Sequence, residues 1–538
     1  MPEYLSPGVY IEEFEMGPRP IEGVGTSTAG FLGLTERGPT KAKLITSWTH
    51  FQRVYGSYFQ KNGDTPYLPY AVEGFFANGG QRCFIGRITL ENATIAEVSL
   101  LQGGASALTV SAVGPGVWGN NVIVAVEGGS LSSATKPLFK LRVFHWKDDP
   151  SSIASIDKKA EFARQIRKNN PPSYYEEFDN ISVDSTVPEY YGKTVSSSLI
   201  SLSLKTGDTG KVPDPPVEKD PTQSNSILLY QLTGGSDGSG TITANDYTAE
   251  GRLDSEGMKI GLEGFREIDE IAIVYVPHAF GVSNLVMELI EHCESLKDRF
   301  LIIDSEPNKR DPNDVSPRDT YVTKYAAFYY PWIKVIDPVT QTVKMIPPGG
   351  HVAGIYARSD IERGVHKAPA NEKVAGAVDI EFPVTKGDQD ILNPKGVNCI
   401  RQFRGRGILV WGARTLSDNT YWKYINVRRL FNYIEESIEE GTQWVVFEPN
   451  DERLWARVRA TITQFLTRVW RDGALMGTKP DEAFFVRCDR TTMTQDDIDN
   501  GRLICIIGIA PVKPAEFVIF RMTQWYGGAA VTEMELRG

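Results

Sequence analysis

The fold class follows from three neighbouring segments: residues 271–276 (IAIVYV), 285–296 (LVMELIEHCESL) and 300–304 (FLIID). The first and third are short, continuous apolar runs, which are typical of strands buried on both faces of a sheet. The middle segment has apolar side chains at positions 285, 286, 289, 290, 293 and 296, and this spacing predicts one buried helical face. A strand, a helix and a second strand in this order indicate a parallel βαβ unit. We therefore expect an α/β (α+β) core domain with a mixed sheet.

Two further amphipathic helices follow toward the C-terminus. Residues 425–440 carry an apolar stripe and end at Gly441, a residue type favoured just after a helix. Residues 451–470 carry a second stripe, with two acidic residues in the first turn that complement the helix dipole. We expect Asn450 to cap this second helix.

A β-rich insertion divides the core in the sequence. Residues 23–95 mix short strands with helix candidates at 49–55 and 67–78, and the α/β pattern begins again at residue 250. We assign residues 23–95 and 250–511 to one discontinuous core domain and residues 96–249 to a β-rich insertion domain. The strand-like runs of the insertion are separated by Gly, Ser and Pro clusters. They are 107–110 (ALTV), 122–126 (VIVAV), 139–144 (FKLRVF) and 199–204 (LISLSL).

Each end of the chain contains a single strand-like run. Near the N-terminus, prolines at positions 2, 7, 18 and 20 bracket residues 8–15 (GVYIEEFE), which favours an extended segment because proline fixes φ and lacks an N–H donor. Near the C-terminus, residues 516–522 (EFVIFRM) follow two prolines. A lone strand cannot form a core and needs a sheet edge. We therefore expect an N-terminal arm, residues 1–22, and a C-terminal arm, residues 512–538, that pair either with their own domain or with another subunit.

The composition excludes several classes of function. The chain has 538 residues with 57 basic and 68 acidic side chains, and its net charge of -11 argues against a general nucleic-acid binder. Its five cysteines are scattered and include no C-x-x-C pair, which indicates reduced thiols rather than a disulfide framework or zinc site. The N-terminal residues lack the apolar segment of a signal peptide, and no run of apolar residues is long enough to span a bilayer. We expect synthesis in the cytoplasm without a signal peptide and no direct membrane insertion.

One motif imitates a catalytic site. Residues 234–238 (GGSDG) match the G-x-S-x-G pattern of a nucleophile elbow, but residues 239–243 do not predict the helix that must follow an elbow. We interpret Ser236 as a turn residue and keep a serine hydrolase using Ser236 as a distant alternative. A surface adhesin that binds a ligand through residues 96–249 is another alternative, and it would require export.

No other pattern predicts chemistry. The chain contains no G-x-x-x-x-G-K-[ST] phosphate loop, and its six histidines do not fall at metal-ligand spacing. We therefore expect no catalytic residue, no metal site and no cofactor, and we expect that the chain is not an enzyme.

The charges are strongly unbalanced between residues 401 and 429. Against one acid, Asp418, this stretch sets Arg401, Arg404, Arg406, Arg414, Lys423, Arg428 and Arg429. The stretch is either a solvated face or a surface complementary to an acidic protein partner. The acidic N-terminal arm and an inner tubular protein are the candidate partners.

The sequence resembles the contractile sheath proteins of phage tails and phage-tail-like injection systems. In the N-terminal half the similar blocks are 5–13 (LSPGVYIEE), 24–33 (VGTSTAGFLG), 36–39 (ERGP), 78–87 (NGGQRCFIGR) and 116–120 (GVWGN). In the C-terminal half they are 330–332 (YPW), 353–358 (AGIYAR), 364–370 (GVHKAPA), 392–394 (LNP), 411–415 (WGART), 427–430 (VRRL), 447–450 (FEPN) and 513–517 (KPAEF). The blocks keep the order of the family, and the resemblance is weakest over residues 127–225.

The resemblance implies a structural subunit of a metastable sheath. Such a sheath polymerises around an inner tube and contracts, without nucleotide hydrolysis, to drive the tube through a target envelope. The implied partners are other copies of the chain, the inner tube protein, baseplate and cap or terminator proteins, and a paralogous sheath subunit, with no nucleic acid. Residues 7–13 look closer to sheaths of injection systems than to many phage sheaths, and a contractile-tailed phage is the alternative. The implied location is a phage or phage-tail-like particle that is released by lysis.

The resemblance also implies which residues make contacts between subunits. The terminal arms are expected to add strands to sheets of neighbouring subunits, a mode of binding called β-augmentation. The expected arm strands contain Val9, Tyr10, Ile11, Glu12, Glu13, Phe517, Val518, Ile519 and Phe520. The expected contacts with the tube or a neighbour are Arg428, Arg429, Arg453, Arg457 and Arg459. We expect the tube contact on the basic helix at 451–471 or, alternatively, near residues 495–502.

Overall fold

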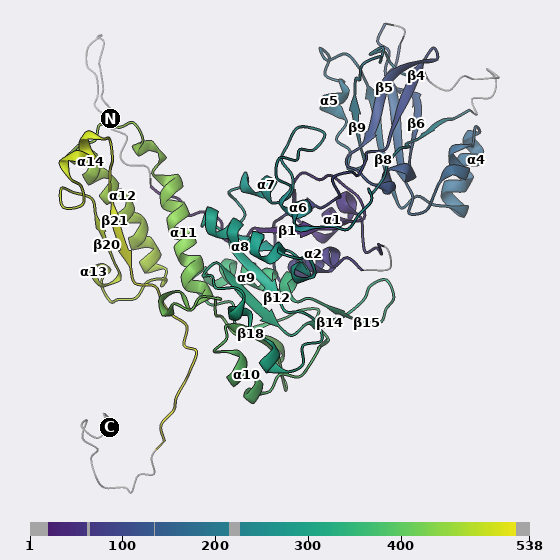
Figure 1. Cartoon of the computed structure of the whole chain (residues 1–538). Coiled ribbons are helices and arrows are strands. Elements are labelled where there is room, and N and C mark those ends of the chain that lie inside the picture. The colour runs from purple at the N-terminus through teal and green to yellow at the C-terminus, as the bar shows by residue number, and fades with distance from the viewer. Residues whose placement is uncertain (1–19, 62–64, 134, 215–225, 523–538) are drawn as a thin grey trace, which may run out of the picture.

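A nine-stranded mixed sheet forms the centre of the protein (Figure 1). The computed structural model describes residues 20–61, 65–133, 135–214 and 226–522. In spatial order the strands of the sheet are β16 (Glu372–Lys373), β19 (Gly407–Trp411), β18 (Val397–Phe403), β13 (Ala326–Tyr330), β12 (Phe300–Asp304), β11 (Ile273–Tyr275), β1 (Ala29–Gly33), β3 (Cys83–Arg87) and β2 (Lys43–Ile45). The strands from β18 to β3 are parallel, and the pairs at the two edges are antiparallel. The predicted α/β core with a mixed sheet is confirmed.

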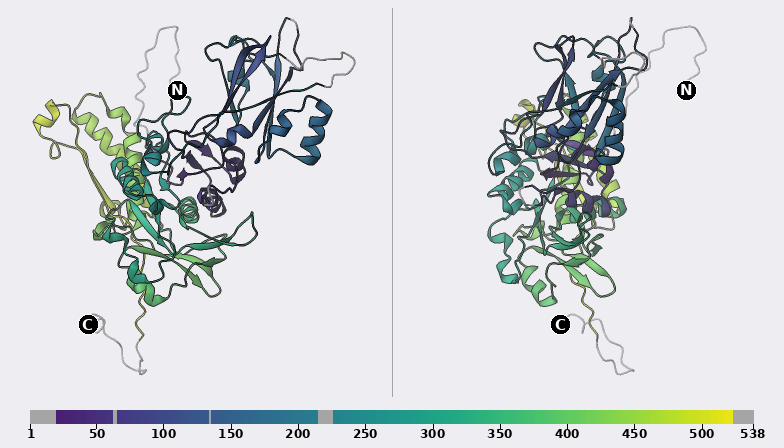
Figure 2. Two further views of the ribbon diagram at one scale, coloured as in Figure 1. Left: turned by 45° about the vertical axis from the view of Figure 1, so that its right-hand side comes forward. Right: turned by 90° about the vertical axis from the view of Figure 1, so that its right-hand side faces the viewer.

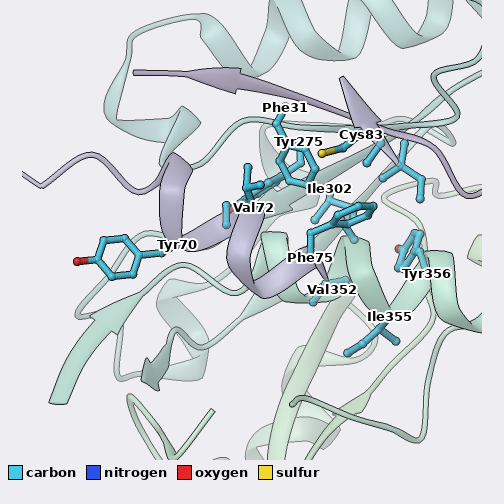
Figure 3. Close-up of a cluster of buried hydrophobic side chains, with 14 of the residues drawn as sticks. Phe31, Tyr70, Val72, Phe75, Cys83, Tyr275, Ile302, Val352, Ile355 and Tyr356 are labelled. Carbon is cyan, nitrogen blue, oxygen red and sulfur yellow. The ribbon is translucent and has the colours of Figure 1, made fainter. Parts of the chain in front are cut away.

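Helices cover both faces of this sheet (Figures 1 and 2). On one face lie α1 (Trp48–Tyr55), α2 (Leu68–Ala77) and α9 (Gly349–Arg363), and on the other lie α7 (Gly261–Arg266) and α8 (Leu285–Leu296). Successive strand residues alternate between the two cores, as a pleated strand requires. Tyr275 and Ile302 face α2 and α9 (Figure 3), whereas Val274 and Leu301 face α8.

The predicted βαβ unit is present in β11, α8 and β12. β11 and β12 pair in parallel, and α8 has the predicted bounds, whereas β11 is shorter than the predicted strand at 271–276. Of the two C-terminal helices, α11 spans Ile425–Gly441 and α12 spans Glu452–Arg471. The prediction that Asn450 caps α12 is wrong. Asp451 is the cap, because its carboxylate accepts a hydrogen bond from the Leu454 N–H at 2.9 Å, while Asn450 Oδ1 accepts one from Trp455 Nε1 at 2.8 Å.

Two smaller sheets lie within residues 97–231, where the sequence predicts strands. One contains β4 (Glu97–Gln102), β5 (Ala105–Ala112) and β9 (Ile200–Ser203), and the other contains β10 (Leu228–Gln231), β6 (Val122–Gly128), β7 (Phe139–His145) and β8 (Tyr174–Ile181). Apolar side chains from both sheets meet in one core, so the two sheets form a sandwich. This β-sandwich lies on the side of the nine-stranded sheet away from α11 and α12 (Figures 1 and 2).

The C-terminal helices and strands form a body of their own beside the sheet. This C-terminal body contains α11, α12, α13 (Pro480–Ala483), β20 (Phe484–Arg487), α14 (Gln495–Asp499) and β21 (Ile506–Ile509), packed around a separate apolar core. Arg429 on α11 makes a buried link to the rest of the protein. The Arg429 guanidinium donates to both carboxylate oxygens of Asp360 on α9, at 2.9 and 2.7 Å, and to the Thr26 carbonyl at 2.8 Å.

The other helices and strands are short. The strands are β14 (Ile333–Ile336), β15 (Val343–Ile346) and β17 (Asp379–Ile380), and the helices are α3 (Ser151–Ala154), α4 (Lys159–Arg164), α5 (Tyr191–Thr194), α6 (Ala244–Thr248) and α10 (Lys386–Leu392). Within the described ranges, we find no helix with the length and apolar character needed to cross a membrane.

Glycines allow α2 and α9 to approach each other closely. A Cβ atom at Gly350 would lie 2.4 Å from the Ala71 Cα atom, and a Cβ atom at Gly354 would lie 2.4 Å from the Phe75 carbonyl oxygen. Both distances are far shorter than van der Waals contact, and both neighbours are backbone atoms that cannot rotate away. The packing of these two helices against the sheet therefore requires glycine at both positions.

We expect Gly354→Ala to lower the free energy of unfolding by about 1–3 kcal/mol, the usual cost of overpacking a buried contact. Alanine is the better helix former, so a loss would come from the collision and not from helix propensity. Denaturant unfolding followed by circular dichroism measures the effect. The control is Gly387→Ala on α10, where the added methyl group meets only Thr385 Oγ1 at 3.8 Å. Equal stability of the two variants would contradict the close approach of α2 and α9.

Candidate functional site: where the terminal segments leave the core

A groove of about 1010 Å³ lies where the C-terminal segment leaves the core. Its walls come from α10, the end of β19 and the loop after α9, and residues 512–518 form one side. The larger side chains that line it are Phe403, Trp411, Arg401, Arg414, Tyr424 and His366. The groove fixes where the C-terminal segment starts its path away from the protein.

Glu516 attaches the segment to this groove through four polar side chains. Its Oε1 atom accepts hydrogen bonds from Arg414 Nε at 2.7 Å and from Asn393 Nδ2 at 2.9 Å. Its Oε2 atom accepts one from the Tyr424 hydroxyl at 3.0 Å and lies 3.3 Å from Lys423 Nζ. Burial alone would raise the pKa of Glu516, but Arg414 and the other donors lower it to about 2. Glu516 is therefore a charged anchor at neutral pH.

Arg414, the main cation that binds Glu516, is held in place because its backbone exchanges hydrogen bonds with the side chain of Asn398. The Arg414 N–H donates to Asn398 Oδ1 at 2.7 Å, and Asn398 Nδ2 donates to the Arg414 carbonyl at 2.8 Å. A second guanidinium nitrogen of Arg414 donates to the Asn393 carbonyl at 2.8 Å. Arg414 is only 7% exposed, so it belongs to this site and not to a solvated basic face.

Beyond Glu516 the chain leaves the protein surface (Figures 1 and 2). The side chains of Phe517, Val518, Ile519 and Phe520 are between 67% and 85% exposed. Residues 517–522 form no strand, and they are in none of the sheets found among the described residues. Within the described residues, the exposed side chains of residues 517–522 are not covered by the protein's own domain. A row of exposed apolar side chains is typical of a surface that another protein covers.

The predicted N-terminal strand residues, Val9 to Glu13, lie outside the described residues, but the first described residues show where that end of the chain leaves. Ile21 is 1% exposed within the core of the C-terminal body, and its carbonyl accepts a hydrogen bond from Arg468 on α12 at 2.5 Å. The Val24 N–H donates to Ser437 Oγ on α11 at 3.1 Å. The described part of the N-terminal segment is therefore attached to α11 and α12.

Arg428 and Arg429 do not lie on the surface, so the expectation that they form part of a basic contact face is wrong. They are 1% and 4% exposed. Arg428 pairs with Glu435 at 2.7 Å, and its guanidinium lies 4.6 Å from the centre of the Trp422 ring. The Arg429 guanidinium donates its hydrogen bonds to Asp360 and to the Thr26 carbonyl, so it is not available to a partner protein. Adjacent arginines in a sequence predict positive charge, but Glu435 on the same helix neutralises Arg428, and the fold brings the distant Asp360 to Arg429.

Arg453, Arg457 and Arg459 are exposed on α12, so a contact through them is sterically open. Arg457 is partly engaged, because its guanidinium lies 4.7 Å from the centre of the Trp444 ring. The alternative tube-contact segment near 495–502 has the opposite charge. It is largely the short helix α14, which carries three aspartates, and its Arg502 pairs with Asp497 at 3.4 Å. Among the described residues, the basic helix α12 is the better candidate.

Ser236 lies in a glycine-rich loop, where its backbone forms an isolated antiparallel bridge with Thr94. Its hydroxyl accepts a hydrogen bond from the Gly238 N–H at 3.1 Å, and Gly234 and Gly238 both have positive φ. Residues 239–243 are not helical, so the helix that a nucleophile elbow requires is absent at this position. The geometry contradicts a serine hydrolase built on Ser236.

Sequence reasoning placed Glu516 only at the start of a strand and missed its role as an anchor. The available signal was a single acid that follows two prolines and precedes a run of apolar residues. Its partners come from three separate segments of the chain, so no local pattern could have identified them.

We expect Glu516→Ala to release residues 512–516 from the groove. Hydrogen bonds to a charged group contribute about 1.5–3 kcal/mol each, so amide exchange in this segment should become roughly ten- to hundredfold faster. Hydrogen–deuterium exchange with mass spectrometry measures the change. Glu306→Ala, which breaks an exposed ion pair with Lys309, is the control and should leave this segment unchanged. Equal exchange in Glu516→Ala and the wild type would contradict the anchor.

The attachment of residues 512–516 through Glu516 should weaken at acidic pH. The pKa of Glu516 is lowered by folding, so the carboxylate stabilises the attached segment at every pH above its ordinary unfolded pKa. This stabilisation is lost as the pH falls from about 4.5 toward 2. Exchange in residues 512–516 of the wild type, corrected for the intrinsic pH effect, should therefore approach that of Glu516→Ala only in this acidic range.

Two family models of phage tail sheath proteins match the C-terminal half of the chain. The phage tail sheath protein central domain matches residues 240–416, and the phage tail sheath C-terminal domain matches residues 417–524. A tail sheath protein of Burkholderia phage BcepMu is 30% identical over 159 residues, which cover 28% of this chain and 33% of that protein. The matches span 27% to 60% of the length of the first curated relatives.

The fold matches solved sheath structures over almost the whole chain. The helical sheath of the anti-feeding prophage (AFP) in its contracted state is 25% identical, with a TM-score of 0.56 and coverage of 96% of this chain and 99% of that one. The sheath of the extracellular contractile injection system PVC in its contracted state has a TM-score of 0.57 at 23% identity, with coverage of 97% and 99%. These relatives are structural sheath proteins, which confirms the expectation that the chain is not an enzyme. The chain belongs to the phage tail sheath protein family.

Proposed function

We propose that the chain is the structural subunit of a contractile sheath that polymerises around an inner tube and drives the tube through a target envelope. The observation that carries this proposal is the C-terminal segment, which is anchored at Glu516 and then exposes four consecutive apolar side chains. Within one subunit, an apolar segment that is anchored at Glu516 but exposed to solvent contributes no stabilising contact. In a polymer, the same segment would bind the next subunit.

We assign the sheath to a phage-tail-like injection system. Support comes from the similarity to the contracted sheath of AFP, which reaches 25% identity with nearly complete coverage of both chains. The sheath of a contractile-tailed phage is the alternative, favoured by the curated tail sheath relatives of phages. In either case the subunit is made in the cytoplasm and leaves the cell with its particle on lysis.

The links between subunits are formed by β-augmentation. The N-terminal residues Val9 to Glu13 and the C-terminal residues Phe517 to Phe520 supply the added strands. A candidate acceptor is the two-stranded sheet of β20 and β21, because each of its strands has one neighbour and one open edge. Each ladder hydrogen bond contributes about 0.5–1.5 kcal/mol net, so one junction with four to six bonds contributes on the order of several kcal/mol.

Such links suit a sheath that contracts without nucleotide hydrolysis. The terminal strands keep neighbouring subunits at high effective concentration while their other contacts change. The free energy of contraction then comes from a better set of contacts between subunits in the contracted sheath. The other partners in this proposal are the inner tube, the baseplate, cap or terminator proteins and a paralogous sheath subunit.

In this proposal, each part of the chain has its own role in the sheath. Residues 1–22 and 512–538 are the linking arms, and residues 23–95 and 250–511 are the rigid core. Residues 96–249 are the insertion domain. The β-sandwich within the insertion lies away from both places where the ends leave the core, so its variation between sheaths would not disturb the links.

We expect Val518→Pro to abolish long sheath tubes while the subunit stays folded. Proline removes the backbone N–H that a strand junction needs. Negative-stain electron microscopy of the chain co-expressed with its tube protein measures tube length, and circular dichroism checks folding. Val518→Ala keeps the N–H and is the matched control, which should form tubes of wild-type length.

Deleting residues 1–20 should have the same effect as Val518→Pro. Long tubes from Val518→Pro or from the deletion would exclude the strand assignment.

We expect reversal of Arg453, Arg457 and Arg459 to Glu to prevent co-assembly with the tube, because all three are exposed on one helix. Folding should be unchanged. The matched control reverses Arg164, Arg167 and Lys168, which are exposed and make the same change in net charge near the β-sandwich. Co-purification with a tagged tube protein measures binding. Binding lost equally in both variants would indicate a general charge effect and contradict the assignment to α12.

A further inference from the structure

Two cysteines separated by 16 residues come together at one end of the β20–β21 sheet. Cys488 directly follows β20, and Cys505 directly precedes β21. The last pair in the antiparallel register is Arg487 with Ile506, so the next opposed pair is Cys488 with Cys505. Opposed residues in antiparallel strands have Cα atoms about 4.5 to 5.5 Å apart, which lies within the range that a disulfide spans.

The surroundings of the two thiols differ. Cys488 is 1% exposed, whereas Cys505 is partly exposed, and both are unlinked in this structure. A hydrogen bond from the Cys505 thiol lowers the pKa of Cys488, although burial opposes this effect, and the positive charge of Arg459 on α12 adds to it. The same shared proton and burial raise the pKa of Cys505. One sulfur of the pair is thus favoured as a thiolate, the nucleophile in thiol–disulfide exchange.

We propose that Cys488 and Cys505 form a disulfide site that closes when the protein meets an oxidising small-molecule disulfide. One cysteine thiolate attacks the oxidant, forms a mixed disulfide and releases one small-molecule thiolate. The second cysteine loses its proton to solvent and attacks the sulfur of the first, which releases the second small-molecule thiolate. The two protein thiols are oxidised to one disulfide, and the oxidant is reduced to two thiols.

The other three cysteines do not share this geometry. Cys83, Cys293 and Cys399 are fully buried on β3, α8 and β18, and burial raises the pKa of each thiol. They are therefore poor nucleophiles in the folded protein. Oxidation should be selective for the pair at the end of the β20–β21 sheet.

The expected consequence is a more rigid small sheet. Two strands on their own are only marginally stable, and here the chain between Cys488 and Cys505 is a 16-residue excursion that carries α14. A disulfide would close this excursion at its base and hold β20 and β21 in register. This inference concerns the isolated subunit and does not depend on the proposed sheath function.

The test is incubation of the native full-length protein with oxidised glutathione, followed by alkylation, non-reducing digestion and mass spectrometry. We expect a cross-linked peptide pair containing Cys488 and Cys505, with the other three cysteines still reduced. Hydrogen–deuterium exchange in residues 484–509 should become slower after oxidation and return to its first rate after reduction.

Serine variants complete the test. In Cys488→Ser, a glutathione adduct should persist on the partly exposed Cys505, because the second thiol is missing. The double variant Cys488→Ser/Cys505→Ser should show neither the cross-link nor the slower exchange. A glutathione adduct that persists on Cys505 of the wild type would show that the sulfurs cannot meet and would overturn the proposal. A cross-link that forms only in denaturant would also overturn it.

Discussion

The ion pair between Arg429 and Asp360 holds the C-terminal body to the central sheet. Both side chains are almost completely buried, and a buried charge is costly unless it is paired and fully hydrogen-bonded. Here one guanidinium satisfies both carboxylate oxygens and the Thr26 carbonyl, and it lies 4.9 Å from the centre of the Tyr356 ring. Removal of either charge would leave the other buried without a partner, at a cost of about 3–5 kcal/mol.

Arg429 also fixes the first described segment of the chain. The hydrogen bond from Arg429 to Thr26 fixes the segment ahead of β1, and the contacts of Ile21 and Val24 continue that attachment along α11 and α12. At the other end, Glu516 binds Arg414, which lies on the same side of the sheet as the start of α11. Polar contacts thus attach the described part of each end to the core.

Much of the core could be predicted from local pattern. The apolar spacing of residues 285–296 gave the bounds of α8, and the stripes of α11 and α12 were equally regular. The pattern failed where a residue's partner lies far away in the chain. Arg428 and Arg429 read as surface charge, since nothing local shows that Asp360 lies beside Arg429. The five cysteines read as scattered, because only the register of β20 and β21 brings Cys488 and Cys505 together.

The β-sandwich shares its apolar core with no part of the central sheet and lies away from both fixed ends. Its turn between β4 and β5 consists of Gly103 and Gly104, and a side chain added at either would meet no atom within 4 Å. Among the described residues, a peptide inserted at this turn would lie far from the groove around Glu516 and from the surface of α12. This turn is therefore the natural position for a label that should leave the groove around Glu516 and the surface of α12 undisturbed.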